Sequence, residues 1–101
     1  MSEWIKAAKK SEIPGDTGKL VEVEGTEIAL FQAKGKIFAI QNTCPHQGGP
    51  LSEGGLRGTE VMCPWHGWNF DVTNGACSFN PAIKVSCFNV KEDGEDVYIE
   101  V

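Results

Sequence analysis

Two short pairs of cysteine and histidine constrain this chain more than any other feature. Cys44 and His46 are separated by one residue, Cys63 and His66 by two, and sixteen residues lie between the pairs. The chain has only two histidines and four cysteines, so both histidines fall in this pattern. Two thiolates and two imidazoles form a four-ligand set that suits zinc or an iron–sulfur cluster. We therefore expect a metal centre rather than four unrelated structural residues.

The division of the ligands between the two segments favours iron and sulfur over zinc. Structural zinc sites usually take two cysteines from one tight turn and two histidines from another. Here each segment supplies one cysteine and one histidine. A [2Fe–2S] cluster needs two protein ligands on each of its two irons, and mixed cysteine and histidine ligation meets that need. The sequence therefore predicts one [2Fe–2S] cluster per chain, held by Cys44, His46, Cys63 and His66.

Short apolar runs, broken by turn residues every eight to twelve positions, predict an all-β sandwich or barrel. The expected strands are residues 20–23, 26–31, 36–40, 85–91 and 97–101, with alternate apolar residues of the last strand on one face. One helical turn is expected near residues 9–13, and Trp4 is assigned to the core or scaffold. Loops at about 42–51 and 62–70 carry the ligand pairs. Binding groups commonly sit on such loops above a rigid frame.

Length and charge exclude several classes of protein. The 101 residues fit one domain, residues 1–101, and nine basic against fourteen acidic residues give a net charge of −5 and a pI near 4.9. An acidic chain is a poor ligand for nucleic acid or for an anionic membrane surface. No apolar run approaches the roughly 20 residues that span a bilayer. The N-terminus lacks a charged-then-apolar leader, so a cytoplasmic protein is expected.

The ligand segments resemble those of the Rieske ferredoxins. The matching residues are Cys44-Pro45-His46, the sixteen-residue interval, and Cys63-Pro64-Trp65-His66-Gly67. Asn80-Pro81-Ala82 resembles the family's proline-containing third loop, at about residues 78–83, which covers the cluster. The resemblance extends over nearly the whole chain. It implies antiparallel β layers with a small cluster-binding subdomain.

The same resemblance implies a role for each ligand. Cys44 and Cys63 would bind the inner iron as thiolates. His46 and His66 would bind the outer iron through Nδ1, near the surface, where the electron is accepted.

Departures from the high-potential members of the family predict a low potential. Those proteins have a disulfide between the two loops, and the matching positions here are Gly49 and Trp65. They also have serine and tyrosine hydroxyls near the cluster, where this chain has Trp68 and Phe70. Fewer hydrogen bonds to sulfur stabilise the reduced cluster less. The midpoint is expected in the lower part of the Rieske range, roughly −150 to +300 mV.

Two features outside the ligand set have alternative interpretations. Cys77 and Cys87 are expected to be buried or partly buried free thiols, with a mutual disulfide or a redox role as the alternative. The acidic hairpin Glu92–Asp96 is expected to be a solvated turn, or else a surface that steers a basic redox partner.

These observations predict a soluble one-electron carrier. By resemblance, it takes electrons from a flavin-containing, NAD(P)H-dependent reductase and passes them to a terminal oxygenase of an aromatic ring-hydroxylating system. The alternative is the small Rieske subunit of a nitrite-reductase-type complex. An oxygenase would need two further histidines and a carboxylate for mononuclear iron. Both histidines are already committed and the chain ends at residue 101, so catalysis is not expected.

Overall fold

The computed structural model of the chain describes residues 3–44, 49–64, 68–78, 80 and 82–100. Within them it contains ten strands and two 3-10 turns, and every strand pairing is antiparallel. In chain order the elements are β1 (Trp4–Lys9), η1 (Lys10–Glu12), β2 (Lys19–Val23), β3 (Thr26–Ala33), β4 (Lys36–Gln41), η2 (Leu51–Glu53), β5 (Leu56–Arg57), β6 (Glu60–Met62), β7 (Asn69–Asp71), β8 (Cys87–Phe88), β9 (Val90–Asp93) and β10 (Asp96–Glu100). No helix among the described residues has the length and apolar character needed to cross a bilayer.

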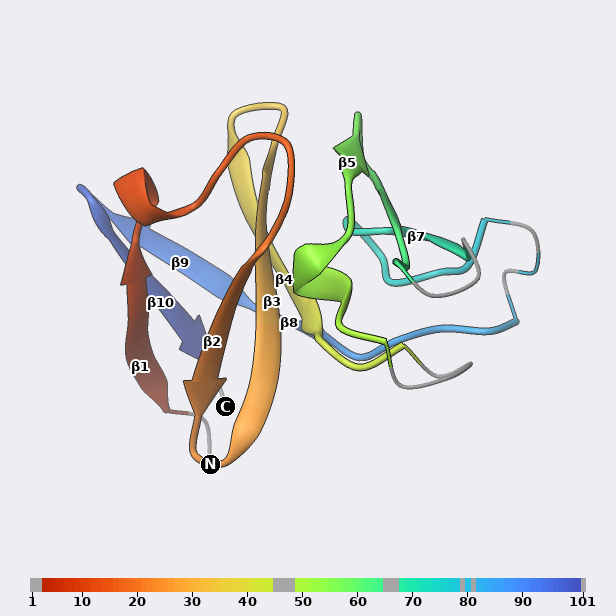
Figure 1. Cartoon of the computed structure of the whole chain (residues 1–101). Helices are drawn as coiled ribbons and strands as arrows, with labels where there is room; N and C mark the ends of the chain where they lie inside the picture. The colour runs from red at the N-terminus through yellow and green to blue at the C-terminus, as the bar shows by residue number, and fades with distance from the viewer. Residues whose placement is uncertain (1–2, 45–48, 65–67, 79, 81, 101) are drawn as a thin grey trace.

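The strands form three small sheets that are stacked as layers (Figure 1). The first sheet has the order β1-β10-β9, the central sheet β2-β3-β4-β8, and the third sheet β5-β6-β7. One apolar core lies between the first and central sheets, and a second lies between the central and third sheets. The central sheet therefore contributes a face to each core.

Strand β3 is buried on both of its faces. Ile28 and Leu30 belong to the core shared with the first sheet, and Ala29 and Phe31 to the core shared with the third sheet. All four side chains are 0% exposed. Successive residues of a strand point to opposite faces, so a strand between two cores needs an uninterrupted apolar run. The run from Ile28 to Phe31 meets that need and places β3 in the middle of the molecule.

Both hairpins of the central sheet turn through two residues with positive φ. Glu24 and Gly25 have φ of 51° and 81°, and Lys34 and Gly35 have φ of 51° and 75°. Two consecutive residues with positive φ are typical of the type I′ turn, whose twist matches that of the flanking strands. Glycine adopts this backbone freely, whereas glutamate and lysine are strained in it.

The structure confirms most of the predicted elements. The expected strands 20–23, 26–31 and 36–40 correspond to β2, β3 and β4, and the expected helical turn at 9–13 contains η1. In β10, Val97 and Ile99 are both 0% exposed, as the alternation of that strand predicts.

The prediction of one strand over residues 85–91 was wrong. Strand β8 pairs with β4 in the central sheet, strand β9 pairs with β10 in the first sheet, and Asn89 lies between them. The chain passes from one layer to the next at this residue. Apolar alternation alone does not reveal the change, because Phe88 of β8 and Val90 of β9 are both partly buried against the same core.

Of the two places predicted for Trp4, core or scaffold, the structure shows the scaffold, because Trp4 begins β1 and is not in the core. Its side chain is 44% exposed and lies opposite Glu100 at the start of β1. The next residue, Ile5, packs against the core instead. Neighbouring residues of a strand face opposite sides, so burial of Ile5 directs Trp4 to the surface.

Replacing Lys34 with asparagine should stabilise the protein, because asparagine tolerates a left-handed backbone better than lysine does. We expect the free energy of unfolding to rise by up to about 1 kcal/mol, a part of the cost of a left-handed residue. Calorimetry at a fixed scan rate should show a higher apparent Tm. The control Gly35→Ala, at a φ of 75°, should lower it. An unchanged Tm for Lys34→Asn would contradict the assigned turn geometry.

Candidate metal centre

The cysteines of the two ligand pairs lie in the same apolar core. Cys44 follows β4 of the central sheet and Cys63 follows β6 of the third sheet. Each is 1% exposed, and both belong to the core that also contains Phe31 and Phe70. The central sheet and the third sheet thus each place one cysteine sulfur in the apolar core between them.

Each of these cysteines closes its own loop with the same kind of backbone hydrogen bond. The N–H of Cys44 donates to the carbonyl oxygen of Gly49 at 2.9 Å, and the N–H of Cys63 donates to that of Trp68 at 2.7 Å. In both loops the acceptor lies five residues after the cysteine. The two loops therefore have matching frames made from the main chain.

The predicted histidine ligands, His46 and His66, lie outside the described residues. By sequence they fall within the two closed loops, two and three residues after the cysteines. In the described part of the chain, no group of three or more histidine, cysteine, aspartate or glutamate side chains converges as a metal site. The structure thus places the two predicted sulfur ligands, and the nitrogen ligands stay a prediction.

Asn42 holds the base of the first loop, a role that the sequence analysis missed. It is 3% exposed, and its Oδ1 accepts a hydrogen bond from the N–H of Ser52 at 2.9 Å. Its backbone carbonyl accepts from the N–H of Leu51 at 2.7 Å, and its N–H donates to the carbonyl of Glu27 at 3.2 Å. These bonds join both ends of the loop to β3. The available signal was a polar residue directly after the end of β4.

The third loop, predicted at about residues 78–83, is closed at its base by the N–H of Cys77, which donates to the carbonyl of Ile83 at 2.8 Å. Ile83 packs against the core that contains the two predicted cysteine ligands. Residues 79 and 81 lie outside the described residues.

The turn before this loop requires glycine. Gly75 has a φ of 77°, and a Cβ at this position would collide with the carbonyl of Val85 and the Sγ of Cys87. The main chain of the turn therefore lies directly against the segment that leads into β8.

The other two cysteines are free thiols in the structure, as predicted. Cys77 is buried at 1% exposure, whereas Cys87 is more exposed than expected. Partial burial raises the pKa of the Cys87 thiol, the charge of Asp71 raises it further, and Lys84 opposes the shift. Cys87 also lies outside the buried core that contains Cys44 and Cys63.

Two aromatic side chains border the same core without offering a hydroxyl group. Phe70 is 0% exposed and belongs to the core, and the half-buried Trp68 packs against it. Neither side chain carries an O–H donor. This arrangement is consistent with the predicted low potential, which stays a prediction.

Comparison with known proteins identifies the family. The family model described as the Rieske [2Fe-2S] domain matches residues 3–89. The chain is also 37% identical over 100 residues to the ferredoxin component of a naphthalene 1,2-dioxygenase system from Pseudomonas aeruginosa. That alignment covers 98% of this chain and 96% of the relative. The chain belongs to the Rieske [2Fe–2S] domain family.

Solved structures agree with this assignment. Sphingomonas yanoikuyae B1 ferredoxin has a TM-score of 0.89 at 25% identity, over 98% of this chain and 99% of that one. A chain in a complex of reduced oxygenase and oxidised ferredoxin of carbazole 1,9a-dioxygenase has a TM-score of 0.85 at 30% identity, over 95% of this chain and 91% of that one. The predicted all-β Rieske fold is confirmed, and so is the prediction of a [2Fe–2S] cluster as the cofactor.

The donor groups of the described residues fit that cofactor. Cys44 and Cys63 bring two thiols, each 1% exposed, into one apolar core, and thiolate is the ligand that iron–sulfur clusters take from cysteine. The buried Gly49 lies at the closing bond of the first loop and carries no side chain that would crowd a cluster.

Replacing Asn42 with alanine should loosen the first loop, because the buried N–H of Ser52 would lose its acceptor. Leaving such a group unsatisfied costs about 1–3 kcal/mol. The cluster-loaded variant should lose its visible absorbance faster than the wild type when an iron chelator is added. Asn89→Ala is the control, because that side chain makes only an exposed hydrogen bond, to Glu100, among the bonds given for the described residues. Equal loss rates for both variants would contradict this role of Asn42.

Proposed function

We propose that Cys44 and Cys63 bind one iron of a [2Fe–2S] cluster and that His46 and His66 bind the other. Support comes from the family, from the burial of both cysteines in one core, and from the matching closure of the two loops. The whole chain, residues 1–101, is then one Rieske domain. Its cluster-binding loops are about 42–51 and 62–70, and its covering loop is about 78–83.

When bound, the cluster supplies reversible one-electron transfer. The chain's own residues shield the sulfur ligands and restrain the main chain around them. Phe31 and Phe70, with the rest of the core, exclude water from the sulfur ligands. The backbone bonds that close the two loops restrain the main chain at Cys44 and Cys63, the two sulfur ligands.

The chain acts as a ferredoxin and not as an enzyme. We infer that it receives single electrons from a flavin-containing, NAD(P)H-dependent reductase and delivers them to a terminal oxygenase of an aromatic-compound dioxygenase system, in the cytoplasm. The observation that carries this function is the similarity to a dioxygenase ferredoxin component over 98% of this chain and 96% of that protein. A solved relative in complex with an oxygenase adds support. For the nitrite-reductase-type alternative, the solved small subunits similar to this chain are 20% and 22% identical to it and support the fold alone.

Reduction of the purified protein should give the spectrum of a Rieske ferredoxin. We expect a reddish-brown oxidised form and, after dithionite, a rhombic electron paramagnetic resonance signal from mixed cysteine and histidine ligation. Redox titration should place the midpoint in the lower half of roughly −150 to +300 mV, because Trp68 and Phe70 offer no hydroxyl to the cluster. A colourless zinc protein would contradict the function. A midpoint in the upper half would contradict only the potential argument.

Replacing Cys63 with alanine should yield an iron-poor protein with a lower apparent Tm, because cluster binding contributes to folding. The matched control is Cys87→Ala, which removes an exposed free thiol outside the proposed ligand set. Iron and acid-labile sulfide should stay at wild-type stoichiometry in the control. Full iron content in Cys63→Ala, or loss of iron in Cys87→Ala, would overturn the ligand assignment.

A further inference from the structure

Part of the central sheet is left uncovered on the side that faces the cluster-binding layer. Ala29 and Phe31 of β3 lie on this face and are buried under the third sheet. The register between β2 and β3 places Leu20, Glu22 and Glu27 on the same face. Leu20 is 46% exposed, and both glutamates are exposed. We call Leu20, Glu22 and Glu27 the open face.

The open face contains two carboxylates at directly opposed positions. Glu22 of β2 pairs with Glu27 of β3, and the exposed Glu24 follows in the turn. Like charges directly opposite each other destabilise a sheet. The ion pairs of the described residues are Lys6–Asp96 at 3.2 Å and Lys10–Glu92 at 2.7 Å, and neither includes a residue of the open face. Its negative charge is therefore not compensated by those pairs.

The open face borders the first ligand loop. The carbonyl of Glu27 accepts a hydrogen bond from the N–H of Asn42 at 3.2 Å, and Cys44 follows two residues later. The open face thus lies beside the start of the first ligand loop, at Asn42.

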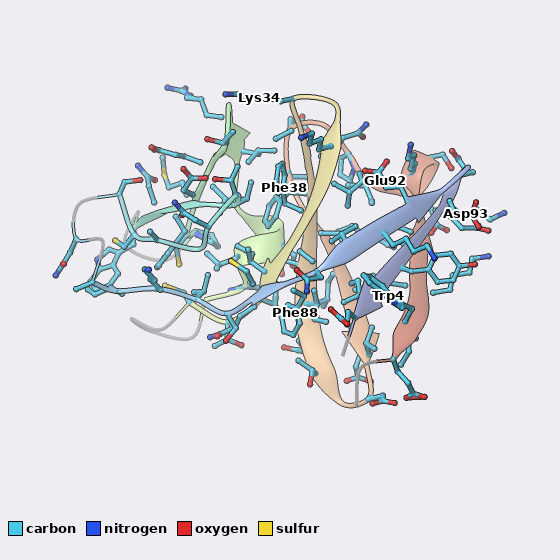
Figure 2. The ribbon with its side chains drawn as sticks, turned by 180° about the vertical axis from the view of Figure 1, so that it is seen from behind. Trp4, Lys34, Phe38, Phe88, Glu92 and Asp93 are labelled. Carbon is cyan, nitrogen blue, oxygen red and sulfur yellow. The ribbon has the colours of Figure 1, made fainter. Side chains whose placement is uncertain are left out.

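The charges along the central sheet are separated by sign. Glu22, Glu24 and Glu27 gather at the β2–β3 turn, and Lys34 and Lys36 lie at the opposite, β3–β4 turn. Figure 2 shows Lys34 at the far end of the sheet. Separated charges of this kind orient a charged partner as it approaches.

The hairpin at Glu92–Asp96, the alternative steering surface from the sequence, is less suited to this task. Lys10 and Lys6 pair with Glu92 and Asp96, and the hydrogen bond from Lys10 lowers the pKa of the Glu92 carboxyl. Glu95 accepts a hydrogen bond from the N–H of Ser11 at 3.2 Å. The hairpin also joins β9 and β10 of the first sheet, on the opposite side of the central sheet from the cluster-binding layer (Figures 1 and 2).

We propose that the open face is a docking surface for a basic electron-accepting protein, whose positive side chains contact Glu22 and Glu27 and whose apolar rim contacts Leu20. The proposal rests on the function proposed above. The charge of the cluster favours an electron acceptor over an electron donor as the partner. This protein is reduced when it meets its acceptor, and it then has one more negative charge than in the oxidised form that meets the donor. After the electron leaves, that charge is lost and the attraction weakens, which helps the partners to separate.

The test uses horse cytochrome c as a defined basic acceptor. Stopped-flow measurements follow its reduction by the pre-reduced, cluster-loaded protein at several ionic strengths. The double variant Glu22→Gln/Glu27→Gln should react about three- to tenfold more slowly at low ionic strength, with a flatter salt dependence. The charge-matched control Asp93→Asn/Glu95→Gln removes two exposed carboxylates of the other hairpin and should stay near the wild-type rate.

Two further measurements exclude a structural cause. The cluster midpoint of Glu22→Gln/Glu27→Gln should equal that of the wild type, and its Tm should be unchanged or higher, because the opposed charges are gone. A wild-type rate in this variant, or an equal slowing in the control, would overturn the docking proposal and leave the carrier function intact. A reduced wild-type protein that does not reduce cytochrome c at all would instead contradict the carrier function.

Discussion

Burial of β3 on both faces is the constraint on which the rest of the structure depends. Ile28 and Leu30 anchor the first sheet, and Ala29 and Phe31 anchor the layer that contains Cys44 and Cys63. A single strand thereby sets the position of the scaffold and of the metal-binding layer relative to each other. Any shift of β3 by one residue would exchange the side chains offered to the two cores. The placement of the sulfur ligands is thus coupled to the register of the central sheet.

The separation into two cores also explains how a chain of this size can hold a metal-binding site at one end of the molecule and a stable scaffold at the other. The core between the first and central sheets contains no proposed ligand, whereas the other core contains Cys44, Cys63 and the free thiol Cys77. Loops that carry ligands can then be long and rich in glycine and proline without weakening the scaffold. The open face exists for the same reason, since the small third sheet covers only part of the central sheet.

Residue patterns predicted those parts of the fold in which local chemistry decides the outcome. Alternation identified β2, β3, β4 and β10, and the paired cysteines and histidines identified the cofactor class. The sequence did not reveal three other features: the change of sheet at Asn89, the exposure of Trp4, and the hydrogen bonds by which Asn42 holds the first loop. Each of these depends on which distant segment a residue meets, and a local pattern contains no such information.

The main-chain bond that closes each ligand loop at its cysteine has a consequence for protein engineering. The N–H groups of Cys44 and Cys63 and the carbonyls of Gly49 and Trp68 are present whatever side chains these positions bear. Residues within the loops can therefore be exchanged while the frame persists. Such a frame is a suitable host for libraries of altered donor sets, in which one scaffold is made to accept different metals.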